Sequence, residues 1–185
     1  MKKYVFMAIG IVLLVGLVVL SRIEVSEPEA SVYDIYNIQG LSVAGMIESL
    51  DEQILDPDII SAAVLERELV IISEQGKDTY AIDEGLFYLS FAPYITSTHP
   101  CHNHNLVTCR GELANETVAV YIEASDGTVL FDDTVTLYEN GFKGIWLPFG
   151  LTAQMTVTYN GLTAETAITT FEDSGTCLTE PLKLS

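Results

Sequence analysis

The sequence predicts an α+β fold: one N-terminal transmembrane helix, a small mixed α/β N-terminal domain, and then an antiparallel β-sandwich-like domain. Three observations support this prediction. An unbroken apolar run begins the chain, apolar residues recur at helical spacing just after residue 40, and short alternating segments dominate after residue 110. We therefore divide the chain into an anchor or signal at 1–22, an acidic linker at 23–40, a mixed domain at 41–95 and a β-rich domain at 96–185.

The N-terminus carries a membrane-targeting segment. Lys2 and Lys3 precede an apolar run from Tyr4 to Leu20. Its 17 residues are close to the minimum for crossing ~30 Å of hydrocarbon, and longer than the ~7–15 apolar residues of a cleaved signal. We expect an uncleaved, single-pass anchor with its lysines in the cytoplasm and the folded portion outside, in the periplasm or at the cell surface. Cleavage of the segment would instead make the protein secreted.

The charge of the exported portion excludes one large class of partner. After residue 22 the chain has 26 acidic and five basic residues, a formal balance of five minus 26, or −21. So acidic a surface repels phosphate backbones and anionic lipid headgroups. Nucleic-acid binding is therefore excluded, and the charge is accounted for by a solvated surface that keeps an exported domain soluble.

The linker and the first helix are distinguished by their apolar spacing. Glu24 to Gln39 contains acidic and small residues without a sustained apolar period, which predicts an extended linker. Ser42 then caps a short amphipathic helix, in which we expect the acidic residues Glu48, Asp51 and Glu52 to avoid the apolar face. The apolar positions that define this helix are Leu41, Ala44, Ile47 and Leu50.

The rest of the mixed domain is predicted to be one helical segment followed by strands. Pro57 suits a first helical position, so the segment from Asp56 through Val64 is expected to be helical. Leu69 to Ile72 is predicted to be a strand, and Gln75 to Asp78 to turn the chain. Aromatic and branched residues predict two further strands, Thr79–Ile82 and Leu86–Phe91.

Beyond residue 110 the predicted elements are all β-strands. Residues 117–123 alternate in polarity, Asp126-Gly127 indicates a hairpin, and strand segments follow at Val129–Phe131 and Thr134–Leu137. The clearest hairpin joins residues 154–159 to 162–168 through Asn160-Gly161, because these two residues tolerate the positive φ angles of a tight turn. An antiparallel sandwich is the natural architecture for this region.

The candidate functional residues are gathered in one short stretch of the β-rich domain. Cys101 and Cys109 bracket a segment rich in histidine, and the protein has three histidines in all: His99, His102 and His104. Sulfur and imidazole together suit a soft metal ion or a redox pair. In an extended segment His102 and His104 share one side, so both could face the same ion. His99 also fits a turn.

The spacing of the cysteines leaves two interpretations open. A loop of seven residues can bring Cys101 and Cys109 to ~5–6 Å, close enough for a disulfide or a bridged metal. Cys177 lies 68 positions beyond Cys109, and three sulfurs converge if the tail returns to the loop. The three cysteines then form either one disulfide with one buried thiol left over, or two to three thiolate ligands of a metal. The donors favour Cu(I), because structural Zn(II) usually takes four ligands with closely paired cysteines.

Several motifs closely resemble the CueP family of exported copper-binding proteins. The similarity covers about residues 40 to 185, and the cysteine intervals of eight and 68 positions match the family pattern. The matching motifs, in order, are Phe87–Tyr94, Thr98–Cys101, Leu106–Leu113, Asn140–Phe142, Gly144–Pro148 and Thr176–Thr179.

The resemblance implies an extracytoplasmic protein that binds copper through Cys101, Cys109 and Cys177, contributes to copper resistance and passes copper to a partner. It also implies a mixed N-terminal domain, a β-rich C-terminal domain and dimerisation. This chain departs from the family in two respects. The better-known members are soluble and periplasmic, whereas this chain carries a predicted tether. In addition, one or both of His102 and His104 differ from the aromatic residues expected in relatives.

We expect a binding protein that captures Cu(I), not an enzyme; any reduction of Cu(II) by its thiols is stoichiometric. The expected partners are copper ions, a copper-receiving or thiol-redox protein, the membrane and a second copy of the chain. One alternative is a thiol–disulfide redox protein in which metal binding is incidental, although the chain lacks a Cys-x-x-Cys motif. Another is a structural or adhesive β domain with one disulfide and no ligand.

Overall fold

The computed structural model describes residues 30–185, and residues 31–185 form one compact unit. The predicted anchor at 1–22 lies outside the described residues. Within residues 30–185, no helix is long and apolar enough to cross a bilayer. The helical elements of this part are α2 (Val32–Ile35), α3 (Val43–Asp51) and the short 3-10 helix η1 (Glu180–Leu182).

The strands of the described residues form three sheets, so the fold is mostly β with few helices. All neighbouring strands are antiparallel except β11, which runs parallel to β4. In spatial order the sheets are β3 (Gly76–Ala81), β2 (Glu68–Ser73), β1 (Ser61–Leu65), β5 (His104–Asn105); then β10 (Leu162–Thr169), β9 (Thr152–Tyr159), β6 (Thr117–Ala124), β7 (Val129–Thr136); and β11 (Cys177–Leu178), β4 (Leu86–Phe91), β8 (Lys143–Pro148).

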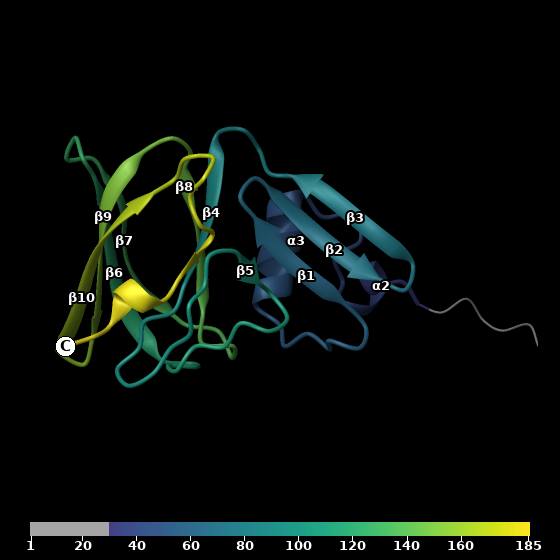
Figure 1. Ribbon diagram of the computed structural model, residues 1–185, viewed down its shortest axis with the longest axis horizontal. Helices are drawn as coiled ribbons and strands as arrows, with labels where there is room; N and C mark the ends of the chain where they lie inside the picture. Colours follow the sequence, from purple (N-terminus) through teal and green to yellow (C-terminus); the bar gives the residue numbers. More distant parts are fainter. Residues whose placement is uncertain (1–29) are drawn as a thin grey trace, which may run out of the picture. The chain divides into compact units, whose positions relative to one another are not determined.

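Strands β4 and β8 lie between β6, β9 and β10 on one side and α3, β1 and β2 on the other (Figure 1), and a hydrophobic cluster lies on each side. Successive side chains of a strand point to opposite faces. Phe87 and Leu89 of β4 therefore pack against β6, β9 and β10, while Tyr88 and Trp146 pack on the side of α3, β1 and β2. The sandwich was expected from residues beyond about 110 alone, whereas the layer that faces β6, β9 and β10 includes β4, which lies before residue 110.

The sheets do not follow the predicted division at residue 95. β4, from the predicted N-terminal domain, pairs with β8 and β11, and β5, from beyond residue 95, pairs with β1. The chain therefore crosses between the two parts twice before residue 110, which places the histidine-rich segment between them.

Helix α3 begins where the sequence predicts. Ser42 Oγ accepts a hydrogen bond from the Gly45 N–H at 3.2 Å, which caps the first turn. Met46, Ile47 and Leu50 form the buried face. The last residue, Asp51, is also buried, so the expectation that all three acidic residues lie on other faces is wrong for this one.

Two other predictions for the N-terminal part are corrected by the structure. Residues 31–38 fold back onto the domain, with Val32, Tyr36 and Ile38 buried, so the linker prediction is wrong from Ser31 onward. The helix expected from Asp56 to Val64 is instead a turn at 57–59 followed by strand β1. Pairing with both β2 and β5 buries residues of β1, and this tertiary pairing overrides the weak helical signal.

The predicted hairpins are confirmed. Tyr159 pairs with Leu162, and the two turn residues between them, Asn160 and Gly161, have φ angles of 51° and 82°. β2 and β4 occupy the predicted regions, and β7 joins the two strand segments predicted after Asp126-Gly127. The turn expected at Gln75–Asp78 is limited to residues 74–75, because β3 already begins at Gly76 and pairs with β2 from there. The short strands β5 and β11, and β8 with its glycine and proline, were not predicted.

Gly144 of β8 leaves room for the Tyr88 side chain. A Cβ at Gly144 would lie 1.7 Å from the Tyr88 hydroxyl oxygen, which donates a hydrogen bond to Asp51. We therefore expect Gly144→Ala to lower the free energy of unfolding by about 1–3 kcal/mol in urea denaturation. Gly85→Ala is the control, because a Cβ there meets nothing within 4 Å. Equal losses in the two variants would contradict this account.

Candidate metal centre

Cys177 reaches the candidate site through strand β11. It lies opposite Ser90 in the parallel pair with β4, and its N–H donates to the His102 carbonyl at 3.0 Å. Cys177 forms a disulfide with Cys101, with Cα atoms 5.5 Å apart. The C-terminal tail therefore does return to the histidine-rich loop, the condition under which the sequence predicted that three sulfurs converge.

Cys109 supplies the third sulfur. It is a free thiol with 7% of its surface exposed, and its Sγ lies 3.6 Å from Cys101 Sγ. A hydrogen bond from the Cys109 N–H to the Asn105 carbonyl closes the turn that follows β5. Ala92 and Phe142 pack around the sulfurs. The structure thus has one disulfide and one buried thiol, which is one of the two arrangements left open by the spacing.

The three histidines occupy different environments. One ring nitrogen of His104 lies with the sulfurs of Cys109 and Cys177, all within 4.8 Å of one another, and His99 forms a similar group with Cys101 and Cys109. His102 is exposed and belongs to neither group found among the described residues. Strand β5 consists of His104 and Asn105, so His102 lies outside the extended segment that was expected to place it beside His104.

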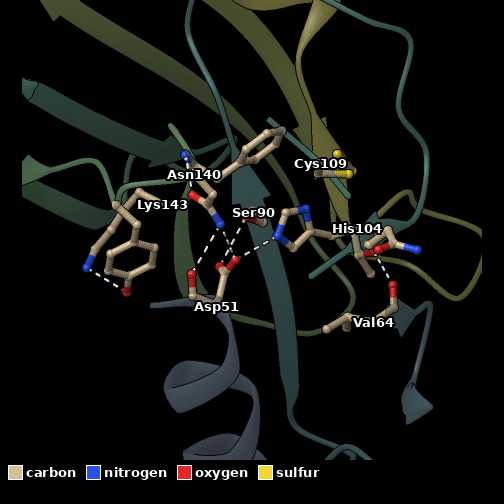
Figure 2. Close-up of polar contacts among 12 residues, drawn as sticks. Asp51, Val64, Ser90, His104, Cys109, Asn140 and Lys143 are labelled. Carbon is tan, nitrogen blue, oxygen red and sulfur yellow. Dashed lines mark hydrogen bonds and ion pairs between the residues drawn. The ribbon is translucent and has the colours of Figure 1, made fainter. Parts of the chain in front are cut away.

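Asp51 is a buried residue of the site that sequence reasoning missed. The His104 Nε2 atom lies 2.8 Å from Asp51 Oδ1, and the Tyr88 hydroxyl donates to Oδ2. Asn140 Nδ2 donates to Oδ1 at 3.3 Å and to the Asp51 carbonyl at 3.1 Å, while the Ser90 hydroxyl lies 3.4 Å from Oδ2 (Figure 2). Because a buried carboxylate is costly without partners, these contacts explain how α3 can end on an acidic residue in the core.

A sequence signal for Asp51 was available. Asp51 follows Ile47 by four positions and Ala44 by seven, so it lies on the apolar stripe of the helix. An acidic residue on such a stripe requires partners from other elements. The spacing alone does not say which ones.

Asp51 and His104 form an ion pair. Burial on its own would raise the pKa of Asp51, but His104, Tyr88 and Asn140 together hold that pKa below its usual value. Burial would likewise lower the pKa of His104, but the Asp51 carboxylate, and to a smaller extent the neighbouring Cys109, raise it to about 9. Both side chains are therefore charged at neutral pH in the metal-free protein.

Contacts on three sides fix the orientation of His104. The backbone N–H of His104 donates to Thr176 Oγ1 at 3.0 Å, and the Thr176 hydroxyl in turn donates to the Val64 carbonyl at 2.6 Å. The imidazole packs against Phe142, with ring centroids 4.8 Å apart. Figure 2 shows the ring between Asp51 and Cys109. With Nε2 engaged by Asp51, the Nδ1 atom is buried and has no hydrogen-bond partner among residues 30–185.

A close approach of two glycines positions Asn140 near the turn that carries Cys109. A Cβ on Gly111 would lie 2.3 Å from the Gly141 carbonyl oxygen, and one on Gly141 would lie 2.4 Å from that of Gly111. The Gly111 N–H donates to the Asn140 carbonyl at 2.7 Å, and Gly141 has a φ of 81°. Glycine at both positions therefore allows the loop before β8 to reach Asp51.

The donors of the site define a class of protein. Both groups found among the described residues consist of cysteine sulfur and imidazole, without a carboxylate oxygen. Such donors select soft ions such as Cu(I) over hard cations. The unpartnered Nδ1 of His104 adds a nitrogen donor beside the sulfurs. The fold and the site together define a thiol-rich protein suited to binding a soft metal.

The comparisons with known proteins identify the family. The family described as periplasmic copper-binding protein CueP matches residues 45–182, and the chain belongs to this family. A solved structure titled "Crystal Structure of S.CueP" is 36% identical to the chain, with a TM-score of 0.78, and the match covers 86% of this chain and 99% of the other. No curated protein matches the chain. The resemblance inferred from the motifs is thus confirmed, and the family's periplasmic description supports an extracytoplasmic location.

The disulfide pairing can be tested by mass spectrometry. Digestion of the non-reduced protein with chymotrypsin, which cuts after Leu106, separates Cys101 from Cys109. We expect a peptide linking Cys101 to Cys177, and alkylation of Cys109 only after denaturation, because this thiol is buried. A peptide linking Cys109 to either partner would contradict the observed pairing.

The ion pair predicts how the stability of the metal-free protein depends on pH. The His104 pKa rises from 6.5 when unfolded to about 9 when folded. The ion pair therefore contributes its full stabilisation to the folded state below pH 6.5, and this contribution is lost as the pH rises to about 9. Cys109→Ser removes the titrating thiol and the smaller share that it contributes to the raised pKa, whereas Asp51, the larger cause, remains. In this background we therefore expect the unfolding free energy to fall by about 1–3 kcal/mol as the pH rises from 6.5 toward 9.

The matched control for this pH dependence is Asp51→Asn in the same Cys109→Ser background. The asparagine keeps the shape of the side chain but removes its charge, so the fall in unfolding free energy between pH 6.5 and 9 should be largely absent. An equal fall in both proteins would show that the ion pair is not its cause.

Proposed function

We propose that this chain captures Cu(I) through the thiolates of Cys101, Cys109 and Cys177 and so contributes to copper resistance outside the cytoplasm. The observation that carries the proposal is the meeting of three sulfurs from distant segments. Cys101 and Cys177 lie within bonding distance, and Cys109 Sγ is 3.6 Å from Cys101 Sγ. In the reduced protein the three sulfurs would offer one ion a ring of soft donors.

The same sulfurs provide a route for reducing Cu(II). Oxidation of the Cys101 and Cys177 thiols forms their S–S bond, releases two protons and yields two electrons, which reduce two Cu(II) ions to Cu(I). The disulfide in the structure corresponds to the product of this step. Each protein molecule can perform it once until a thiol-redox partner reduces the disulfide. The proposed activity is therefore stoichiometric binding and reduction rather than enzymatic turnover.

The surroundings of the sulfurs suit transfer of the ion. Phe142 and Ala92 limit access of water to the site, while Cys101 is only half-buried and offers a way in for a partner's thiols. We propose that the partner is a copper-receiving protein. We also propose that the chain forms a dimer and that residues 4–20 tether it to the membrane. A tether would confine the copper site to the outer face of the membrane.

A second candidate function is thiol–disulfide exchange in which metal binding is incidental. The disulfide beside a free thiol favours it, because Cys109 lies 3.6 Å from one of the bonded sulfurs. Exchange would transfer the bond from Cys101–Cys177 to a pair containing Cys109. The two functions differ in whether the reduced protein holds copper tightly.

Copper stoichiometry of the reduced, soluble portion tests the proposal. We expect about one tightly bound Cu(I) per chain, with far weaker binding of Zn(II), in anaerobic competition against a chromophoric chelator. Each of Cys101→Ser, Cys109→Ser and Cys177→Ser should weaken binding at least about 100-fold, since outer-shell changes alone cost 10–100-fold. Exposed His102 provides the control, and His102→Gln should bind as the wild type does.

Two results would overturn this function. Binding that is unaffected by all three substitutions would remove the cysteines from the site, and tighter binding of Zn(II) than of Cu(I) would remove copper as the cargo. In cells, Cys177→Ser should lower copper tolerance, whereas a purely structural domain predicts unchanged tolerance. Cu(II) added anaerobically should consume two thiols for every two Cu(I) formed.

A further inference from the structure

Oxidation of Cys101 and Cys177 leaves a different set of donors at the site. The two bonded sulfurs are no longer thiolates, but Cys109 remains a free, buried thiol. A ring nitrogen of His104 lies within 4.8 Å of Cys109 Sγ. The structure therefore retains one sulfur and one nitrogen donor side by side after the disulfide has formed.

His104 is prepared to donate through Nδ1. The Asp51 side chain has no hydrogen to donate when ionised, so the hydrogen bond of 2.8 Å requires a hydrogen on His104 Nε2. Nδ1 is then the ring nitrogen that can release its proton and offer a lone pair to a metal. This atom is buried and has no hydrogen-bond partner in the structure.

Asp51 is well placed to control the direction of this lone pair. Tyr88 and Asn140 hold the carboxylate from β4 and from the loop before β8, while Asp51 itself ends α3. A carboxylate that accepts from a metal-binding histidine fixes the tautomer and the ring orientation, and raises the basicity of the donor nitrogen. The other histidine near the sulfurs, His99, has no carboxylate partner in the structure.

We propose that His104 Nδ1 and Cys109 Sγ form a two-donor Cu(I) site that persists after Cys101 and Cys177 are oxidised, with Asp51 as the positioning residue that orients His104. This inference rests on the proposed copper binding and adds a function for the oxidised form. The protein can then keep hold of one Cu(I) after its thiols have reduced Cu(II), instead of releasing both ions when the disulfide forms.

The test measures Cu(I) binding to the oxidised protein. Full-length protein with the Cys101–Cys177 bond intact, verified by mass before and after, is titrated with Cu(I) without oxygen against a chromophoric chelator. We expect one ion per chain, a loss of affinity of at least about 100-fold in His104→Gln, and a loss of about 10- to 100-fold in Asp51→Asn. His102→Gln is the control and should remain within about threefold of wild type, because His102 is exposed and belongs to neither donor group found among the described residues. His99→Gln, which alters the other donor group, should weaken binding far less than His104→Gln.

A spectroscopic readout separates a positioning role from a structural one. In the ¹⁵N spectrum of the oxidised protein, Cu(I) should shift the Nδ1 signal of His104 while Nε2 keeps its hydrogen, and Asp51→Asn should allow the other tautomer to appear. All variants are compared at equal folded fraction, judged from thermal melts. Where Asp51→Asn is too unstable, Tyr88→Phe provides a second perturbation of the carboxylate, with a smaller expected loss of affinity.

The outcomes distinguish the two proposals. If the reduced wild type fails to bind Cu(I), the proposed function fails. If the reduced protein binds Cu(I) but the oxidised protein does not, or if His99→Gln abolishes binding to the oxidised protein while His104→Gln and Asp51→Asn do not, only the two-donor site is overturned. Metal on Nε2 of His104 would overturn the assignment of Asp51.

Discussion

The parallel pairing of β11 with β4 is the constraint on which the candidate copper site depends. The Ser90 N–H donates to the Thr176 carbonyl at 2.9 Å and the Ala92 N–H donates to the Leu178 carbonyl at 3.0 Å, so Cys177 has a defined register beside β4. The tail beyond it is secured by burial of Leu182 and Leu184 in the main core. Burial of each such side chain stabilises the fold by about 1.5–3 kcal/mol, so the position of the Cys177 sulfur depends on the hydrophobic core.

Strand β4 links this core to the polar chemistry of the site. One of its faces contributes Phe87 and Leu89 to the sandwich, and the other contributes Tyr88 and Ser90 to the carboxylate of Asp51. A shift of β4 by one residue would exchange these faces. The fully bonded carboxylate then orients His104, so packing on one side of the strand holds an imidazole in place on the other. The orientation of His104 is therefore fixed by the fold itself.

The sequence predicted the parts of this fold that depend on local signals. The Ser42 cap, the Asn160-Gly161 turn and the alternation of β6 each have a short-range cause, and each was found where expected. The three cysteines were also predicted as the candidate site, and the motifs around them indicated the CueP family. Here local chemistry and recognisable spacing were sufficient.

The remaining features depend on contacts between distant segments. Strands β5 and β11 have two residues each and exist only because β1 and β4 offer them an edge. Asp51 could be placed on the apolar face of its helix by spacing, but its partners come from 37 to 89 positions further along the chain. Nor does the spacing of the cysteines favour Cys177 over Cys109 as the partner of Cys101. Such pairings are decided by tertiary packing, which a single sequence does not reveal.

X-ray absorption at the copper edge of the reduced, Cu(I)-loaded protein tests the central claim most directly. The account predicts a Cu(I) edge and an inner shell dominated by sulfur, with sulfur scattering reduced when Cys177 is replaced by serine. An inner shell of nitrogen and oxygen only, or one that does not change in the Cys177→Ser protein, would show that the three sulfurs do not hold the ion together.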